Sequence, residues 1–147
     1  MFSRLLIISL ILLPVIDLQA ADTRQVWEVD DLLKAKSDSV VLRDRDGIIL
    51  KRVERKQLLI MRKAMSDIES ASERQALLTI IKGDRPNASA GPVNGRDMIL
   101  INFAMLDTIG SDRDQWAALL GHEMAHLKLN HSSQARKRRI PLKIVEL

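Results

Sequence analysis

The sequence contains no cysteine and no tyrosine, and its aromatic side chains are limited to two tryptophans and two phenylalanines among 147 residues. Without cysteine, the chain has no disulfide framework, no thiolate ligand for a metal and no lipid-modified cysteine. Proteins that bind single-stranded nucleic acids stack the bases on aromatic side chains, which are scarce here. The net charge of +4 and the pI near 9.7 therefore do not by themselves indicate a nucleic-acid partner, and we expect none.

The sequence also lacks a hydrophobic run of the about 20 residues that a membrane-spanning helix needs. Its apolar stretch near the N-terminus covers residues 5–13, follows Arg4 and is broken by Pro14, and Asp17 ends the apolar residues that follow. A positive residue, a short apolar run and then a small residue such as Ala20 are typical of a secretory signal peptide. We predict that residues 1–20 are a signal peptide cleaved after Ala20, so that the protein is periplasmic or secreted. An uncleaved membrane anchor is the alternative.

The remaining residues, 21–147, are predicted to form one domain, as their mixture of 46% hydrophobic and 29% charged residues suits a globular protein. The apolar patterns and turn formers predict an α+β fold. The predicted elements are a short helix within 22–36, a hairpin of 40–42 and 48–50, a helix over 53–70, a strand over 76–82, a loop over 86–96, a strand over 98–106 and a helix from about Asp112 to about Asn130. Ser111 and Asp114 resemble a capping box at the start of the last helix.

This last helix contains the strongest chemical signal, an HExxH motif made by His122, Glu123 and His126. In a helix of 3.6 residues per turn the two histidines lie about 40° apart in azimuth and one turn apart in height, so both rings can bind one zinc ion. Glu123 lies about 100° from His122, which places its carboxylate beside the metal as a base for a water molecule rather than as a ligand.

Two histidines at this spacing can also be ordinary residues of a helix surface, or belong to a structural domain with an incidental motif. The helical context favours the zinc site, because the segment over 116–129 (WAALLGHEMAHLKL) has only two charged residues, Glu123 and Lys128. A helix that is apolar nearly all round is predicted to be buried. Buried imidazoles and a buried carboxylate would then need a metal as their partner.

The residues around the motif distinguish between classes of zinc peptidase. A metzincin would have glycine at 129 and histidine at 132, where this chain has Leu129 and Ser132. His131 lies about 180° from His122 around the helix and cannot join the same metal while the helix continues. The remaining layout, the gluzincin type, takes its third ligand from a glutamate on a later helix. After His131 the only carboxylate side chain is that of Glu146.

Three segments of the chain resemble the zinc metallopeptidase family that includes HtpX and the CAAX prenyl proteases, and specifically its exported, periplasmic branch. The segments are Pro86 to Ala88 (PNA), the strand predicted over 98–106 and the stretch over 116–131, which holds the HExxH motif and a further histidine. The resemblance covers roughly residues 55–135. It implies a zincin-like partial catalytic domain in which a small sheet packs on the HExxH helix.

The resemblance also implies roles for individual residues. His122 and His126 would be ligands of Zn2+, and Glu123 would be the catalytic base or acid. The strand ahead of the zinc helix would be the sheet edge that pairs with an extended protein or peptide substrate. The third ligand of the family is a glutamate in a later Glu-x-x-x-Asp motif, and no such motif follows position 131. The chain therefore resembles the N-terminal part of a catalytic domain.

From these observations we predict an exported zinc metalloendopeptidase that acts on proteins or peptides in envelope protein quality control. Association with the envelope membrane is a further expectation. The alternative is a truncated, inactive remnant that binds peptide or a partner protein through its sheet edge. A third zinc ligand would separate the two hypotheses. Within the chain Glu69, Glu73 and Glu146 are the candidates, and a partner chain is another source.

The export prediction can be tested on the mature protein itself. N-terminal sequencing should return Ala21 as the first residue, because the small residues around the predicted cleavage site provide the only good cleavage signal after the apolar run. A sequence that starts at Met1, read from protein in a membrane fraction, would instead identify an uncleaved anchor.

Overall fold

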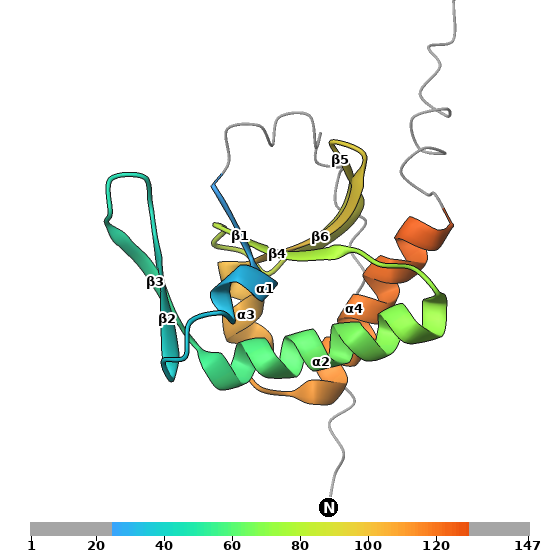
Figure 1. Cartoon of the computed structure of the whole chain (residues 1–147), viewed down its shortest axis with the longest axis horizontal. Helices are drawn as coiled ribbons and strands as arrows, with labels where there is room; N and C mark the ends of the chain where they lie inside the picture. The colour runs from blue at the N-terminus through green and yellow to red at the C-terminus, as the bar shows by residue number, and fades with distance from the viewer. Residues whose placement is uncertain (1–24, 130–147) are drawn as a thin grey trace, which may run out of the picture.

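The computed structural model describes residues 25–129, which form a mixed α+β fold (Figure 1). The strands are β1 (Val26–Glu28), β2 (Ser39–Arg43), β3 (Ile49–Glu54), β4 (Leu77–Ile81), β5 (Ala88–Val93) and β6 (Arg96–Asn102), and the helices are α1 (Val29–Leu32), α2 (Arg55–Ser72), α3 (Phe103–Ile109) and α4 (Arg113–Lys128). The predicted signal peptide lies outside the described residues. Within residues 25–129, no helix has both the length and the apolar character required to cross a bilayer.

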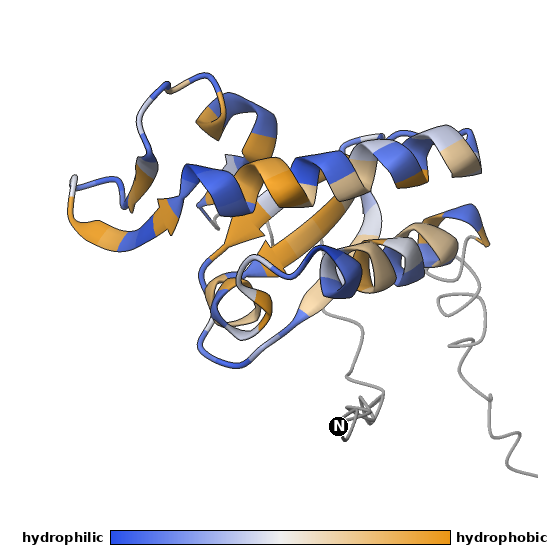
Figure 2. Cartoon of the chain, turned by 90° about the horizontal axis from the view of Figure 1, so that it is seen from below, coloured by the Kyte–Doolittle hydropathy of each residue, from blue (hydrophilic) through white to orange (hydrophobic). Residues whose placement is uncertain are grey.

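The main sheet has four strands in the order β1-β4-β6-β5, in which β4 and β6 are parallel and the other neighbours antiparallel. The helices lie on one face of this sheet, with α2 and α4 side by side beneath it (Figure 1). The apolar sides of the strands and helices meet between these two layers, as Figure 2 shows in orange. The fully buried side chains of this core include Leu58, Met61, Met65, Ile80, Ile99 and Ile101.

β6 is an inner strand, so the expectation that the strand over 98–106 forms the sheet edge is wrong. The edge beside it is β5, which occupies part of the segment that we predicted as a loop over 86–96. The two strands are joined by a two-residue turn at Asn94 and Gly95, whose φ angles are 49° and 77°. Asn-Gly is the preferred sequence for such a turn because both positions need positive φ. The proline and glycine content of the segment concealed this hairpin.

The apolar run over 98–106 is also not one strand, because β6 ends at Asn102 and α3 begins at Phe103. The side chain of Asn102 accepts a hydrogen bond from the backbone N–H of Met105, at 2.9 Å, and so caps the new helix. It also accepts one from the N–H of Asn87 at 3.1 Å and donates one to the carbonyl of Arg85. This buried amide therefore ties the loop before β5 to the junction of β6 and α3.

Close packing against Asn102 explains one glycine of the same loop. A Cβ atom placed on Gly83 would lie 2.5 Å from Nδ2 of Asn102, which is too close for any side chain. The carbonyl of Gly83 also accepts a hydrogen bond from the N–H of Ala104, at 3.2 Å. The loop between β4 and β5 is therefore held on two sides, which fixes where β5 begins.

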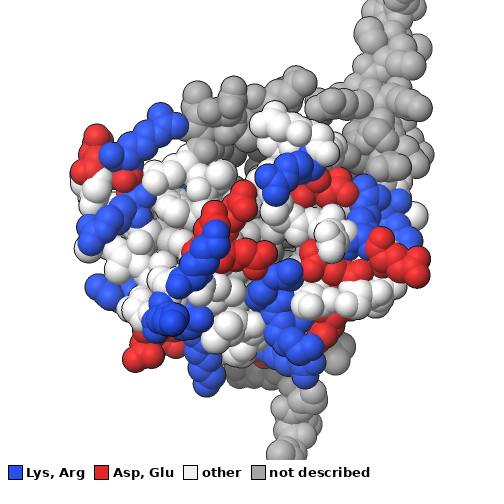
Figure 3. Space-filling view, viewed as in Figure 1, with Lys and Arg blue, Asp and Glu red and all other residues white. Residues whose placement is uncertain are grey.

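The prediction of a helix over 53–70 is confirmed with a small shift to Arg55–Ser72, since residues 53 and 54 belong to β3. Of the predicted apolar stripe of Leu58, Met61, Met65 and Ile68, the first three are fully buried and Ile68 is partly buried. On its outer side, basic and acidic residues are interspersed (Figure 3) and several form ion pairs, such as Lys63 with Asp67 at 2.6 Å. Exposed pairs of this kind contribute little, about 0.3–0.5 kcal/mol each.

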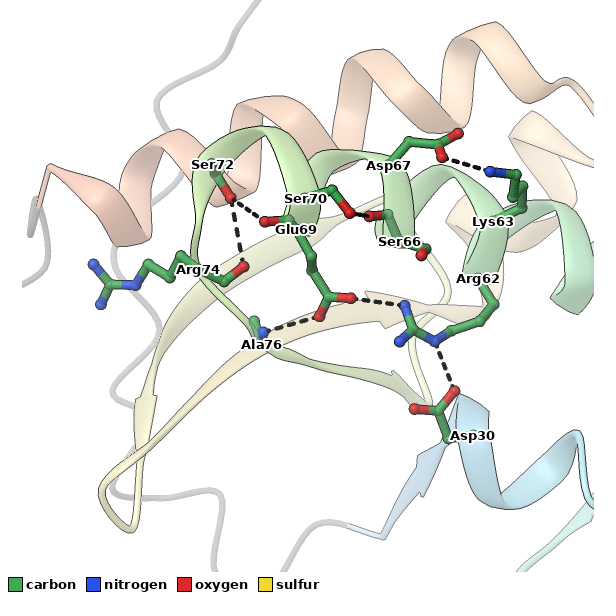
Figure 4. A network of polar contacts seen from close by, with 10 residues as sticks. All are labelled: Asp30, Arg62, Lys63, Ser66, Asp67, Glu69, Ser70, Ser72, Arg74 and Ala76. Atoms are coloured by element: carbon green, nitrogen blue, oxygen red, sulfur yellow. Dashed lines mark hydrogen bonds and ion pairs between the residues drawn. The ribbon is translucent and has the colours of Figure 1, made fainter.

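A more buried ion network holds the C-terminal half of α2 to its neighbours (Figure 4). Arg62 donates to Asp30 of α1 at 2.8 Å and to Glu69 of α2 at 3.0 Å. Glu69 also accepts the backbone N–H of Ala76, just before β4, at 3.2 Å. Burial tends to lower the pKa of Arg62, but its two carboxylate partners raise it overall, so the guanidinium stays charged. The network thus connects α2 to α1 and to the residue before β4.

The early hairpin is confirmed as β2 and β3, which form a separate two-stranded sheet at the periphery, far from α4 (Figure 1). Its turn is held by Asp44, whose carboxylate accepts the N–H groups of Asp46 at 3.0 Å and Ile48 at 2.8 Å. Gly47 provides the positive φ of 84° that this turn requires. The short helix predicted within 22–36 is also present, as α1, but the strand β1 before it was not predicted.

The role of Asn102 predicts a large effect of removing its side chain. Asn102→Ala should lower the free energy of unfolding by about 2–4 kcal/mol, because it removes a helix cap and leaves buried backbone groups without partners. Urea denaturation followed by circular dichroism measures the change. Asn94→Gly is the control, since glycine suits its left-handed φ of 49° and stability should stay within about 0.5 kcal/mol. An effect of Asn102→Ala no larger than that of the control would contradict this role.

Candidate metal centre

The helix that carries the HExxH motif, α4, starts as predicted. Asp112 is its N-cap, and the carboxylate accepts the backbone N–H groups of Asp114 and Gln115, both at 3.0 Å. The Ser-x-x-Asp pattern had suggested Ser111 as the cap, but the capping residue is Asp112. The hydrogen bonds from these N–H groups hold the pKa of Asp112 below its usual value. The charged carboxylate at a helix N-terminus is also favoured by the helix dipole.

The prediction that α4 is buried on all sides is wrong. One face is buried, through Trp116, Leu120, Glu123, Met124 and Leu127. The other carries small residues, Ala117, Ala118 and Ala125, which are exposed together with Leu129. Alanine counts as apolar in a sequence pattern but buries little area, so these positions do not drive burial. Since His122 is exposed and His126 half-buried, burial does not by itself require a metal at the two imidazoles.

The two histidines of the motif nevertheless converge. The Nε2 atoms of His122 and His126 lie 2.9 Å apart, and the rings meet edge to face with their centroids 4.5 Å apart. Two imidazole nitrogens on one tetrahedral zinc, each about 2.05 Å from the metal, are separated by about 3.3 Å. A small outward movement of the rings therefore suffices for both to bind one ion. His122 is exposed and His126 half-buried, so an ion from solvent has access.

Glu123 is the one member of the motif that is buried, with a relative exposure of 7%. Among residues 25–129 no hydrogen bond to its carboxylate is found, and His122 is the neighbour whose charge acts on it. Burial raises the pKa of this carboxyl group, while the charge of His122 opposes the rise. A largely buried carboxylate with a raised pKa, next to two convergent imidazoles, accepts a proton more readily than an exposed one. It is therefore suited to act as a base.

The position of α4 against its neighbours shows which flank bears the histidines. Lys128 and Arg113 face α2, where they donate to the carbonyl of Ser72 at 3.4 Å and to Asp67 at 3.5 Å. At 100° per residue, Lys128 lies about 140° around the helix from the mean direction of His122 and His126. The histidines thus lie on the flank turned away from α2, while α4 packs on β5 and β6 of the sheet.

The donor set fits zinc in kind but is short by one ligand. Imidazole nitrogen is a common zinc ligand, and catalytic sites have three protein ligands and an open fourth position. Within the described part of the chain, no group of three His, Cys, Asp or Glu side chains could hold a metal. Of the candidates for a third ligand, Glu69 is engaged with Arg62, and Glu73 is the left-handed residue that ends α2. Glu146 and His131 lie outside the described residues.

The sequence patterns missed one feature of the site, the edge strand β5, which among residues 25–129 pairs with β6 alone and leaves its other side free. Ala88 and Ala90 belong to this edge strand, which lies against α4. A signal was present in the sequence, because Asn94-Gly95 flanked by short strands indicates a hairpin. It was outweighed by the loop-like composition of the segment.

The geometry predicts zinc binding that is detectable but weaker than that of a complete three-ligand site. His126→Ala should weaken it by more than about tenfold, since even loss of an outer-shell partner costs about 10–100-fold. Isothermal titration calorimetry of the 147-residue protein measures both values. Ala117→Ser, on the opposite flank of α4, should leave the affinity unchanged. Equal affinity in His126→Ala would place the metal elsewhere.

One comparison with known proteins finds a match that covers this part of the chain. A family model, that of peptidase family M48, matches residues 53–142, which is more than half of the chain. The match includes α2, the sheet from β4 to β6, and the whole of α4 with its HExxH motif. No significant match was found among the curated proteins or among the solved structures. With a match of this extent, the chain belongs to peptidase family M48.

Proposed function

We propose that the protein is a zinc-dependent endopeptidase with a zincin-like arrangement of sheet and helix, and that it acts on extended polypeptide in the cell envelope. The observation that carries the proposal is the 2.9 Å separation of the Nε2 atoms of His122 and His126 beside the buried Glu123. An ordinary pair of surface histidines would not require a buried carboxylate next to it. Membership of a peptidase family supports the same reading.

In this proposal each residue of the motif has one task. His122 and His126 hold the zinc ion through Nε2. Zinc, when bound, lowers the pKa of a water to about 7 and polarises the scissile carbonyl. Glu123 takes a proton from the attacking water and passes it to the leaving amine. Its raised pKa suits both steps, because a carboxyl group with a pKa closer to neutrality accepts and returns a proton at a smaller cost.

The substrate would lie along β5, the free edge of the sheet that packs against α4. An extended chain can add to such an edge through its backbone, as in other cases of β-strand addition. The third ligand would come from a residue outside 25–129 or from another chain. A signal peptide over residues 1–20 would place this activity in the periplasm or outside the cell, where envelope protein quality control is its proposed role.

A second function is favoured by one specific observation. Because no three side chains of the kinds that bind zinc come together within residues 25–129, the protein in this alternative binds peptides along β5 without cleaving them. This alternative, an inactive peptide-binding or partner-binding protein, uses the same edge and differs only in turnover.

Cleavage of casein by the zinc-loaded protein tests the proposal. With fluorescein-labelled casein as substrate, cleavage should release fluorescent peptides. Glu123→Gln should reduce the rate of cleavage by about 10²–10⁴-fold, the usual contribution of a general base. Zinc affinity should stay within about threefold, because Glu123 is not a ligand. Binding of casein without cleavage by the unsubstituted protein, at saturating zinc, would support the peptide-binding alternative instead.

A further inference from the structure

The hydrogen-bond register of β5 shows which of its backbone groups face the open side. Asn87 lies opposite Asn102, and the N–H of Asn102 donates to the carbonyl of Asn87 at 3.2 Å. These two residues therefore form a hydrogen-bonded pair. In an antiparallel ladder such pairs alternate with pairs that make no bonds to each other. Ser89, Gly91 and Val93 thus use their backbone groups on β6.

The residues between them direct their backbone groups to the free edge. These are Ala88, Ala90 and Pro92. Pro86 lies two residues before β5 begins, where β6 has already ended at Asn102. Proline has no N–H, so Pro86 and Pro92 offer only a carbonyl. Among the described residues, Ala88 and Ala90 alone offer both a donor and an acceptor along this edge. If each residue that offers both a backbone donor and an acceptor is called a complete rung, the free edge has two complete rungs, with a proline on each side.

Prolines at these positions cost the sheet nothing, because neither removes an N–H that would bond to β6. They do have an effect on what can bind. An unprotected edge strand invites pairing with the edge of another sheet, and proline is one of the devices that prevent it. Here the device is interrupted at Ala88 and Ala90, in the strand that packs on the zinc helix.

The side chains of the two open rungs are small. Ala88 and Ala90 pair with Ile101 and Ile99, which are fully buried, so their methyl groups point into the core and not toward a bound chain. The edge can therefore recognise a peptide through its backbone and contributes little selection for side chains. A bound segment must be extended and must have its own backbone groups free, as in an unfolded polypeptide.

We propose that Pro86 and Pro92 restrict the β5 edge to two rungs, so that it takes a short extended segment of unfolded polypeptide and rejects the edges of folded sheets, including that of a second copy of this chain. This inference rests on the proposed function and names its substrate class. The two prolines determine specificity without taking part in the chemistry, since neither belongs to the HExxH motif.

The inference is tested by variants that remove or add a backbone N–H along the free side of β5. They are made in the Glu123→Gln background, where binding can be measured without cleavage. The probe is fluorescein-labelled casein, with affinity read from fluorescence anisotropy at saturating zinc. Ala90→Pro removes a free-edge donor while leaving the β5–β6 bonds in place, and it should weaken binding about tenfold or more. Pro92→Ala adds a donor to the edge and should strengthen binding about three- to tenfold.

Val93→Ala is the matched control, because the backbone N–H of Val93 points to β6, and its affinity should not change. Circular dichroism verifies that each variant is folded. If Ala90→Pro does not fold, the gain in Pro92→Ala still decides the question. Equal affinities in Pro92→Ala and Val93→Ala would overturn the proposal.

Sedimentation velocity tests the exclusion of a second copy. The double variant Pro86→Ala with Pro92→Ala should self-associate at least tenfold more strongly than the parent, since β5 then offers three complete rungs and the residue at position 86 gains a backbone N–H. Unchanged self-association would overturn this part of the proposal.

The assay separates this inference from the proposed function. If the unsubstituted protein cleaves casein and Ala90→Pro cleaves it with the same KM, the edge proposal fails while the peptidase assignment holds. If nothing is cleaved but the affinities change as expected, the edge proposal holds and the peptidase assignment fails.

Discussion

The packing of one face of α4 against the rest of the domain is the interaction on which the site depends. Trp116 and Leu120 are fully buried, and the indole N–H of Trp116 donates to the carbonyl of Gly110 at 2.9 Å. These contacts determine which face of α4 is turned toward the core. Once this orientation is set, helix geometry leaves His122 and His126 on a flank and Glu123 at the margin of the core. The burial of Glu123 is thus a consequence of core packing, and so is the raised pKa of its carboxyl group.

The second constraint is the amide of Asn102, which connects the core to the free edge of the sheet. By bonding to the backbone of Arg85 and Asn87, it holds the segment that enters β5, and its bond to Met105 ends β6 and starts α3. Three backbone segments thus depend on one buried polar side chain. Removing such a side chain lowers stability by more than the net contribution of its hydrogen bonds, because the backbone groups that it bonded stay buried without partners. β5 is therefore in a defined register with β6. This register determines which of its residues direct their backbone groups to the free side and which bond to β6.

The sequence was sufficient for elements whose pattern is local. The stripe on α2 and the acidic start of α4 have periodicity and capping that follow from neighbouring residues. It was insufficient where tertiary contacts decide. β5 has the composition of a loop and becomes a strand because β6 supplies its partner. The run over 98–106 is apolar throughout, and only the cap at Asn102 divides it into a strand and a helix. For α4, helix geometry correctly predicted that His122 and His126 converge, but burial was overestimated because alanine and leucine were counted alike.

The two halves of the proposed site need each other on energetic grounds. Two complete rungs supply four backbone hydrogen bonds, each with a net contribution of about 0.5–1.5 kcal/mol, or about 2–6 kcal/mol together. The loss of translational and rotational freedom on association costs about 4–15 kcal/mol. The edge of β5 alone therefore holds a peptide weakly, and a bound chain gains enough only where further contacts, such as those at the histidine flank of α4, add to the ladder. A short ladder next to the proposed metal centre suits turnover, because a long one would hold product as firmly as substrate.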